Sequence, residues 1–113
     1  MPPLKRDIPV EPVDISTLKS LTFHERLAIG IERLKAERGV TNKMLGEQLG
    51  VDEPYMSRLA RAMSDVRLSI LDKMKRAWDV DDDDLLKLTE ADLPLIAAWK
   101  ARQKKKKPAG ETP

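Results

Sequence analysis

The residues best suited to recognition chemistry gather in one short segment of the chain. Drawn as a helix with ~100° per residue, this segment places its polar and charged residues, together with Pro54, on one side and its flanks. The polar and charged residues are Glu53, Tyr55, Ser57, Arg58 and Arg61. The other side carries Met56, Leu59 and Met63. Guanidinium and hydroxyl groups can hydrogen-bond to DNA base edges and phosphate oxygens. The spacing therefore predicts a helix that buries an apolar stripe and displays a polar, partly cationic one.

Two short helical patterns that meet at Gly50 would position this segment. Thr41 suits the cap of the first helix, because its hydroxyl can accept from a backbone amide one turn on. Leu45 and Leu49 are four residues apart and share a face. Gly50 suits the left-handed residue that turns the chain, and Asp52 can cap the second helix. This arrangement is typical of a helix-turn-helix, whose second helix usually enters the DNA major groove.

The position of each polar residue divides the predicted DNA contacts into two sets. Residues on the exposed face of the second helix are predicted to contact base edges, and they are Glu53, Pro54, Tyr55, Ser57 and Arg58. Residues at the start of the first helix, at the end of the second and in the loop beyond are predicted to contact phosphates, and they are Thr41, Asn42, Lys43, Arg61, Ser64 and Arg67.

Several of these residues also have an ordinary structural explanation. Arg58 and Arg61 could be solvated helix charges, but the helix-turn-helix pattern around them favours DNA contact. Ser57 could approach a base edge or be a plain surface serine, and Tyr55 could touch DNA or pack on the rim. Glu53 could accept from a cytosine amino group, although the helix dipole alone favours a carboxylate at this end. We favour the second role for Glu53.

Several motifs occur in the order and at the spacing of a known family. They are Ile31–Thr41, Leu45–Val51, Met56–Leu59, Leu68 with Leu71 and Met74–Trp78, and Val80 with Leu85 and Leu86. Over residues 27–86 the chain thereby resembles the phage repressor and Cro-type helix-turn-helix proteins, also called the XRE family. The resemblance implies an all-α, lambda-repressor-like domain of five helices that binds double-stranded DNA.

The sequence departs from the family pattern at particular positions. Asn42 stands where the family often has glutamine, and Glu53 where it more often has a neutral or basic residue. Ala60 and Ala62 replace a glutamate and a glycine near the end of the recognition helix, and Asp79 replaces the glycine that usually ends the fourth helix. These changes concern base recognition more than the fold.

The other helices are predicted from cap signals and apolar spacing. Thr22 and Glu25 form a capping-box pattern that starts the first helix at Phe23 and leads to Gly39. Further helices are expected over residues 68–78 and 82–88, and a sixth after a cap at Thr89. The residues predicted to be buried are Phe23, Leu27, Ile31 and Leu34 in the first helix and Leu45, Leu49, Val51, Met56, Leu59, Leu71 and Met74 beyond it.

Composition divides the chain into three parts. Residues 1–19 contain Pro2, Pro3, Pro9 and Pro12, which predicts an extended arm. Residues 20–88 form the predicted helix-turn-helix domain and hold 12 basic and 13 acidic side chains. Such a balance is unusual for a DNA-binding domain, but the two signs are clustered separately, which matters more than the total. Residues 89–113 are predicted to form the sixth helix and a basic, disordered tail.

The C-terminal part is predicted to contribute to DNA binding in two ways. Lys104, Lys105, Lys106 and Lys107 could be a solvated end or could neutralise phosphates without reading sequence, and we favour the second. The family resemblance also implies a homodimer on an inverted repeat. The apolar residues predicted to pair the subunits are Leu85, Leu86, Leu88, Leu93, Ile96 and Trp99.

Composition argues against other classes of function. The chain has no cysteine, which excludes disulfides, thiolate zinc sites and cysteine nucleophiles. Its single histidine, His24, is predicted to be a surface residue rather than a ligand or catalyst. Asp81–Asp84 could attract a hard cation, but acidic residues at a helix start are the simpler explanation. We therefore expect no enzyme, no cofactor and no metal.

No segment is apolar enough to span a membrane, and no signal-peptide pattern opens the chain. We expect a cytoplasmic protein of bacterial, phage or plasmid origin. The leading hypothesis is sequence-specific DNA binding by a transcriptional repressor or autoregulator. The alternative is an antitoxin-like or adaptor module that binds a protein partner, with DNA binding secondary.

Overall fold

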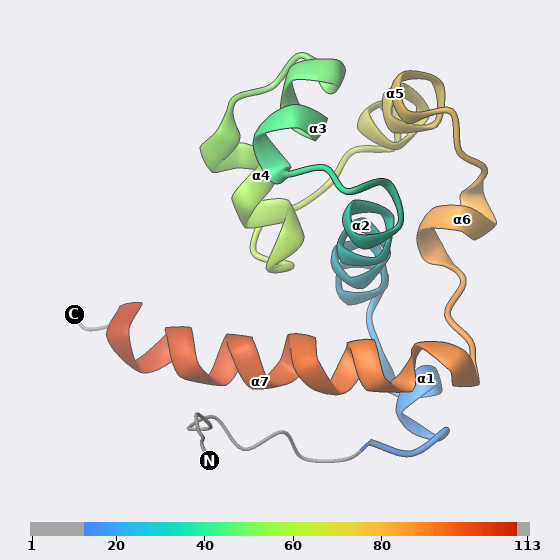
Figure 1. Ribbon diagram of the computed structural model, residues 1–113, viewed down its shortest axis with the longest axis vertical. Helices are drawn as coiled ribbons and strands as arrows, with labels where there is room; N and C mark the ends of the chain where they lie inside the picture. The colour runs from blue at the N-terminus through green and yellow to red at the C-terminus, as the bar shows by residue number, and fades with distance from the viewer. Residues whose placement is uncertain (1–12, 111–113) are drawn as a thin grey trace. The chain divides into compact units, whose positions relative to one another are not determined.

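The computed structural model describes the backbone of residues 13–110 and the side chains of residues 13–103. This part of the chain is all-α and contains no strand, as the sequence predicts (Figure 1). Its elements are α1 (Thr17–Ser20), α2 (Phe23–Arg38), α3 (Asn42–Leu49), α4 (Glu53–Ala60), α5 (Leu68–Trp78), α6 (Asp82–Leu86), the 3₁₀ turn η1 (Glu90–Asp92) and α7 (Leu93–Gly110).

The chain divides into two compact units. One unit spans Ser20–Leu88 and contains α2 to α6. The other joins the segment around α1 to the segment from Thr89 onward, with η1 and α7. The prolines on which the predicted extended arm depends, Pro2, Pro3, Pro9 and Pro12, lie outside the described residues.

Helix α2 begins and ends where the cap signals place it. The Thr22 hydroxyl accepts from the Glu25 amide, and the Glu25 carboxylate accepts from the Thr22 amide, both at about 3 Å. Gly39 ends the helix in the left-handed conformation. Phe23 corrects the predicted buried stripe, because its side chain is 76% exposed. It is the first residue of α2, and the buried stripe starts one turn later at Leu27.

The core of the Ser20–Leu88 unit is aliphatic, with one tryptophan at its centre. Helix α2 packs against α4 and α6, and α3 packs against α4 and α5. The Trp78 indole nitrogen donates to the Leu45 carbonyl at 3.1 Å, which satisfies this buried donor and ties α5 to α3. Val51 and Leu71, predicted to be buried, are only partly buried at the edge of the core.

Helix α6 is fixed to α2 by a close backbone approach and by one arginine. A Cβ atom built at Gly30 would lie 1.8 Å from the Leu85 carbonyl oxygen, so only glycine permits this approach. Arg33 donates to the Asp84 carbonyl at 2.6 Å and to the Lys87 carbonyl at 3.0 Å. These bonds use carbonyls at the end of α6 that the short helix leaves free. Helix α6 stops at Leu86 and not at Leu88 as predicted, because Lys87 has an extended backbone conformation.

Four of the six residues predicted to pair the subunits are buried within one chain. Leu85 and Leu88 are buried, and Leu85 belongs to the core cluster that faces α2. Ile96 and Trp99 are buried as well. Of the six predicted pairing residues, only Leu86 and Leu93 remain half-buried in the described chain. The sequence predicts that these apolar residues are free to pair with a second copy, whereas the four buried side chains are covered by their own chain.

The C-terminal segment is helical over a longer range than predicted. The Asp92 carboxylate accepts from the Thr89 amide at 2.8 Å, as the cap signal indicates. Helix α7 then runs from Leu93 to Gly110 and includes the backbone of the lysine run, residues 104–107. Helix α7 is therefore longer than the predicted sixth helix, and disorder at the end of the chain stays a prediction.

Candidate nucleic-acid interface

Helices α3 and α4 form the helix-turn-helix that the sequence predicts. The Thr41 hydroxyl accepts from the Met44 amide at 3.2 Å and starts α3. Gly50 has φ of 85°, and the amides of Gly50 and Val51 both donate to the Gly46 carbonyl. The Asp52 carboxylate accepts from the Tyr55 amide at 2.9 Å and starts α4, with Pro54 in its first turn. The turn is thus closed by caps on both sides.

Helix α4 has one buried face and one accessible face. Met56, Leu59 and Ala60 are buried in the core. Among the residues predicted to contact bases, Glu53, Pro54 and Arg58 are exposed, and Tyr55 and Ser57 are half-buried. The two faces agree with the predicted helix register.

The end of α4 is a left-handed turn built on alanine. Ala62 has φ of 58°, its amide donates to the Leu59 carbonyl, and the Met63 amide donates to the Arg58 carbonyl at 2.9 Å. These bonds form the Schellman motif, which usually has glycine at the left-handed residue. The helix stops at Ala60, so Met63 leaves the predicted apolar stripe and is 64% exposed.

The turn after α4 brings Ser64 beside Arg58. The Arg58 Nε donates to the Ser64 hydroxyl at 3.1 Å. The guanidinium carbon of Arg58 also lies 5.7 Å from the centre of the Tyr55 ring, within the range of a cation–π contact. The sequence predicts a phosphate contact for Ser64 and does not indicate this pairing. The two residues are six apart, beyond the three- and four-residue spacings at which helical side chains meet.

The residues predicted to contact phosphates have mixed surroundings. Lys43 and Arg67 are exposed. Arg61 is half-buried, and its Nε lies 3.4 Å from the Ser57 carbonyl, a long bond. Asn42 is half-buried, and within the described residues its Oδ1 is buried without a hydrogen-bond donor. Lys43 and Arg67 are therefore the freest cations of this set.

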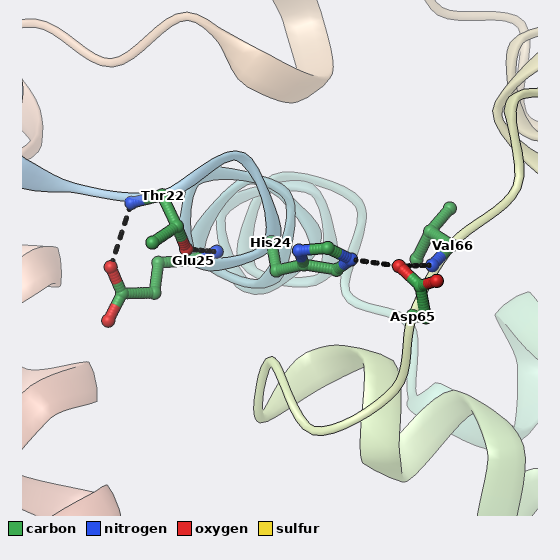
Figure 2. A network of polar contacts seen from close by, with 5 residues as sticks. All are labelled: Thr22, His24, Glu25, Asp65 and Val66. Atoms are coloured by element: carbon green, nitrogen blue, oxygen red, sulfur yellow. Dashed lines mark hydrogen bonds and ion pairs between the residues drawn. The ribbon is translucent and has the colours of Figure 1, made fainter.

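A polar contact ties the start of α2 to the loop after α4. The His24 Nε2 lies 2.9 Å from the Asp65 Oδ1, and the same oxygen accepts from the Val66 amide at 3.1 Å (Figure 2). His24 lies at the surface with its side chain 39% exposed, and it has a partner 41 residues along the chain, which the sequence does not indicate. Asp65 directly follows Ser64, so this contact anchors the loop that carries the Arg58 partner.

The acidic run at α6 has structural partners. The Asp84 carboxylate accepts from the Asp81 amide at 2.9 Å, and Asp82 pairs with Lys75 at 2.9 Å. Hydrogen bonding to Asp82 and its charge raise the pKa of Lys75. Over residues 13–103 no group of three or more acidic, histidine or cysteine side chains is placed to hold a metal ion. No helix in the described part of the chain is long and apolar enough to cross a membrane.

Comparison with known proteins gives one informative match. The chain is similar to the crystal structure of a hypothetical transcription factor, NHTF, from Neisseria, with 26% sequence identity and a TM-score of 0.58. The match covers 80% of this chain and 99% of that chain. No protein-family model and no curated protein matches the sequence. The fold is thus like that of a transcription factor.

Proposed function

We propose that this protein binds double-stranded DNA in a sequence-specific manner and regulates transcription, as the XRE-type resemblance implies. The observation that carries the proposal is the accessible polar face of α4, the second helix of a capped helix-turn-helix. Such a helix places residues from its N-terminal part against base edges in the major groove. Similarity to a protein described as a hypothetical transcription factor supports the same function.

In this proposal five residues of the two predicted sets keep their roles. Ser57 and Arg58 contact base edges, while Lys43 and Arg67, which are exposed, contact phosphates. Arg61 contacts a phosphate after giving up its long bond to the Ser57 carbonyl. Phosphate contacts fix the position of the protein on the duplex, and base contacts decide the sequence.

We further propose that two copies bind an inverted repeat. One recognition helix covers only a few base pairs, which is too short a site to stand out among genomic competitors. Two-fold pairing doubles the site, with half-site centres about 34 Å apart. Sedimentation with and without the selected DNA tests pairing. A single copy on a selected site without symmetry would refute the inverted repeat and leave DNA binding intact.

Selection of bound sequences from a random DNA pool tests the main proposal. We expect a preferred site that the wild-type protein binds more tightly than scrambled DNA at two salt concentrations. Arg58→Ala should relax the preference at one base position, and Arg61→Ala should weaken all sequences alike. Arg76→Ala is the matched control, because Arg76 is an exposed arginine on α5 outside both predicted sets. Failure to enrich any sequence would favour the antitoxin-like or adaptor alternative.

The lysine run is proposed to add affinity without changing sequence choice. Each phosphate contact that is lost should reduce the log–log salt slope by about 0.9. Removing residues 103–113 should therefore flatten the slope, weaken selected and scrambled DNA in similar proportion, and leave the preferred sequence unchanged. An unchanged slope would show that Lys104–Lys107 do not contact phosphates.

A further inference from the structure

We infer that Arg58 recognises guanine through its two terminal NH₂ groups, and that Ser64 and Tyr55 are positioning residues that orient it for this contact. The inference rests on the proposed function and adds to it the base that is recognised. It also assigns to Ser64 and Tyr55 a role different from direct DNA contact.

Arg58 has hydrogen-bond donors that the protein itself does not use. A guanidinium has five N–H donors in a fixed plane. The Nε–H of Arg58 is used by the Ser64 hydroxyl at 3.1 Å. Its other polar contact in the described residues is the Tyr55 ring, which faces the guanidinium carbon and takes no N–H in the guanidinium plane. The two terminal NH₂ groups therefore form the accessible end of an exposed side chain.

The base must fit two parallel donors. In the major groove guanine presents two acceptors side by side, N7 and O6. Adenine pairs one acceptor with a donor, thymine offers one acceptor beside a methyl group, and cytosine presents a donor. An arginine that approaches with its two terminal nitrogens can make two bonds to guanine and to no other single base. Guanine is therefore the expected base opposite Arg58.

The aromatic ring contributes to the orientation of Arg58. Tyr55 precedes Arg58 by three residues on α4, a spacing at which side chains on a helix meet. The contact at 5.7 Å draws the guanidinium toward the N-terminal part of α4. That end of a recognition helix faces the base edges, whereas phosphates lie at its flanks. A side chain held in place before binding also loses less conformational entropy on binding.

The residues on both sides of Ser64 make contacts that place it beside Arg58. The Met63 amide donates to the Arg58 carbonyl, which folds the chain back along α4. Asp65, the next residue, is held by His24 and by the Val66 amide (Figure 2). Ser64 thus lies between two residues that have contacts of their own, and its hydroxyl lies beside the Arg58 Nε. This arrangement distinguishes Ser64 from an ordinary surface serine.

Modified bases test the contact directly on the selected site. At the guanine that depends on Arg58, 7-deazaguanine removes the N7 acceptor, and we expect binding to weaken by about tenfold, within the ~5- to 150-fold range of a bidentate pair. Hypoxanthine is the matched control, because it keeps N7 and O6 and lacks only the minor-groove amino group. It should bind like guanine. Equal binding of guanine and 7-deazaguanine, or a loss on Arg58→Ala that is the same for every base, would overturn the inference in favour of a phosphate contact.

Substitutions at Ser64 and Tyr55 test the positioning role. The readout is the ratio of affinities for guanine and adenine at that one base pair, which a general loss of fold would not change selectively. Ser64→Ala and Tyr55→Leu should each reduce this ratio by severalfold. Ser64→Thr and Tyr55→Phe should retain it, because they keep the hydroxyl and the ring. Ser69→Ala, an exposed serine on α5, is the control.

Failure of this inference can be told from failure of the proposed function. If the pool yields no preferred sequence, the proposed function is wrong and the inference with it. If a preferred site is found but Ser64→Ala and Tyr55→Leu leave the guanine-to-adenine ratio unchanged, only the positioning role is wrong. Thermal melting of each variant ensures that affinities are compared between folded proteins.

Discussion

The two connections that flank α4 are held by different forces. The turn before α4, from Leu49 to Asp52, joins two buried helix faces, and Leu49 is only 4% exposed. The loop after α4, from Arg61 to Arg67, carries the exposed Met63, packs the partly buried Val66 against the core, and adds polar contacts of Ser64 and Asp65. The first connection uses glycine at its left-handed residue, and the second uses alanine. Burial therefore fixes the angle between α3 and α4, while weaker polar contacts orient the guanidinium of Arg58.

This difference separates stability from recognition. Changes in the first connection should lower the free energy of unfolding or shift α4 as a whole. Changes in the second should alter the orientation of Arg58 at little cost in stability, because surface polar contacts contribute little. The substitutions below test this division, from the largest expected effect to the smallest.

The largest effect is expected for Leu49→Ala. Leu49 lies in the core cluster, so the substitution removes buried methyl groups and leaves a cavity. The free energy of unfolding should fall by about 2–5 kcal/mol, measured by urea denaturation. Met44→Ala on the same helix is the control, because Met44 is partly exposed, and it should cost clearly less. Equal losses at the two positions would contradict the register of α3.

A smaller effect is expected for Gly50→Ala. A Cβ atom at Gly50 would meet nothing within 4 Å, so only the backbone conformation at φ of 85° opposes it. A left-handed alanine costs about 1–2 kcal/mol. Alanine also lowers the conformational entropy of the unfolded chain, which offsets part of this cost. Denaturation should show a net loss of about 1 kcal/mol. Gly50→Asn should lose less, because asparagine tolerates this conformation. If Gly50→Asn lost as much, backbone strain would not be the cause.

How much of the structure could be predicted from the sequence depends on whether a feature is formed by neighbouring or by distant residues. The bounds of α2 and α3 and the start of α4 follow from local signals, namely the caps at Thr22, Thr41 and Asp52 and the glycines at 39 and 50. Each signal involves residues within one helical turn of each other, so it can be recognised in the sequence without knowledge of the packing. The predicted two faces of α4 follow from the same local spacing.

The contacts that could not be predicted join distant residues or depend on packing. Ser64 reaches Arg58 only because Ala62 turns left-handed, a conformation that alanine does not signal. His24 finds Asp65 only when α2 and the loop after α4 come together. Leu85 was assigned to a dimer surface because the close approach of α6 to Gly30 has no local signature. The spacing of apolar residues shows which face of a helix is apolar. It does not show which part of the protein covers that face.

A gain in stability is expected for Ala62→Gly. Glycine removes the cost of a left-handed alanine, about 1–2 kcal/mol. It also makes the unfolded chain more flexible, which destabilises the folded protein by about 0.4–1 kcal/mol. The net gain should be about 0.5–1 kcal/mol by denaturation. Asp79→Gly, at the left-handed end of α5, should gain less, because aspartate is better tolerated there. If Ala62→Gly destabilised the protein, the half-buried methyl group would matter more than the backbone strain.

The smallest effect is expected for the contact between His24 and Asp65. The side chains are 39% and 96% exposed, so water screens their interaction. A double-mutant cycle with His24→Gln and Asp65→Asn should give a coupling energy of a few tenths of a kcal/mol, in the range of about 0.2–1 for exposed pairs. The same substitutions should change the orientation of Ser64 more than the stability, because Asp65 anchors its loop next to Arg58. Reduced base preference with nearly unchanged melting would therefore support the division between the two connections. A coupling energy of several kcal/mol would show instead that this loop, like the turn before α4, helps to hold the fold together.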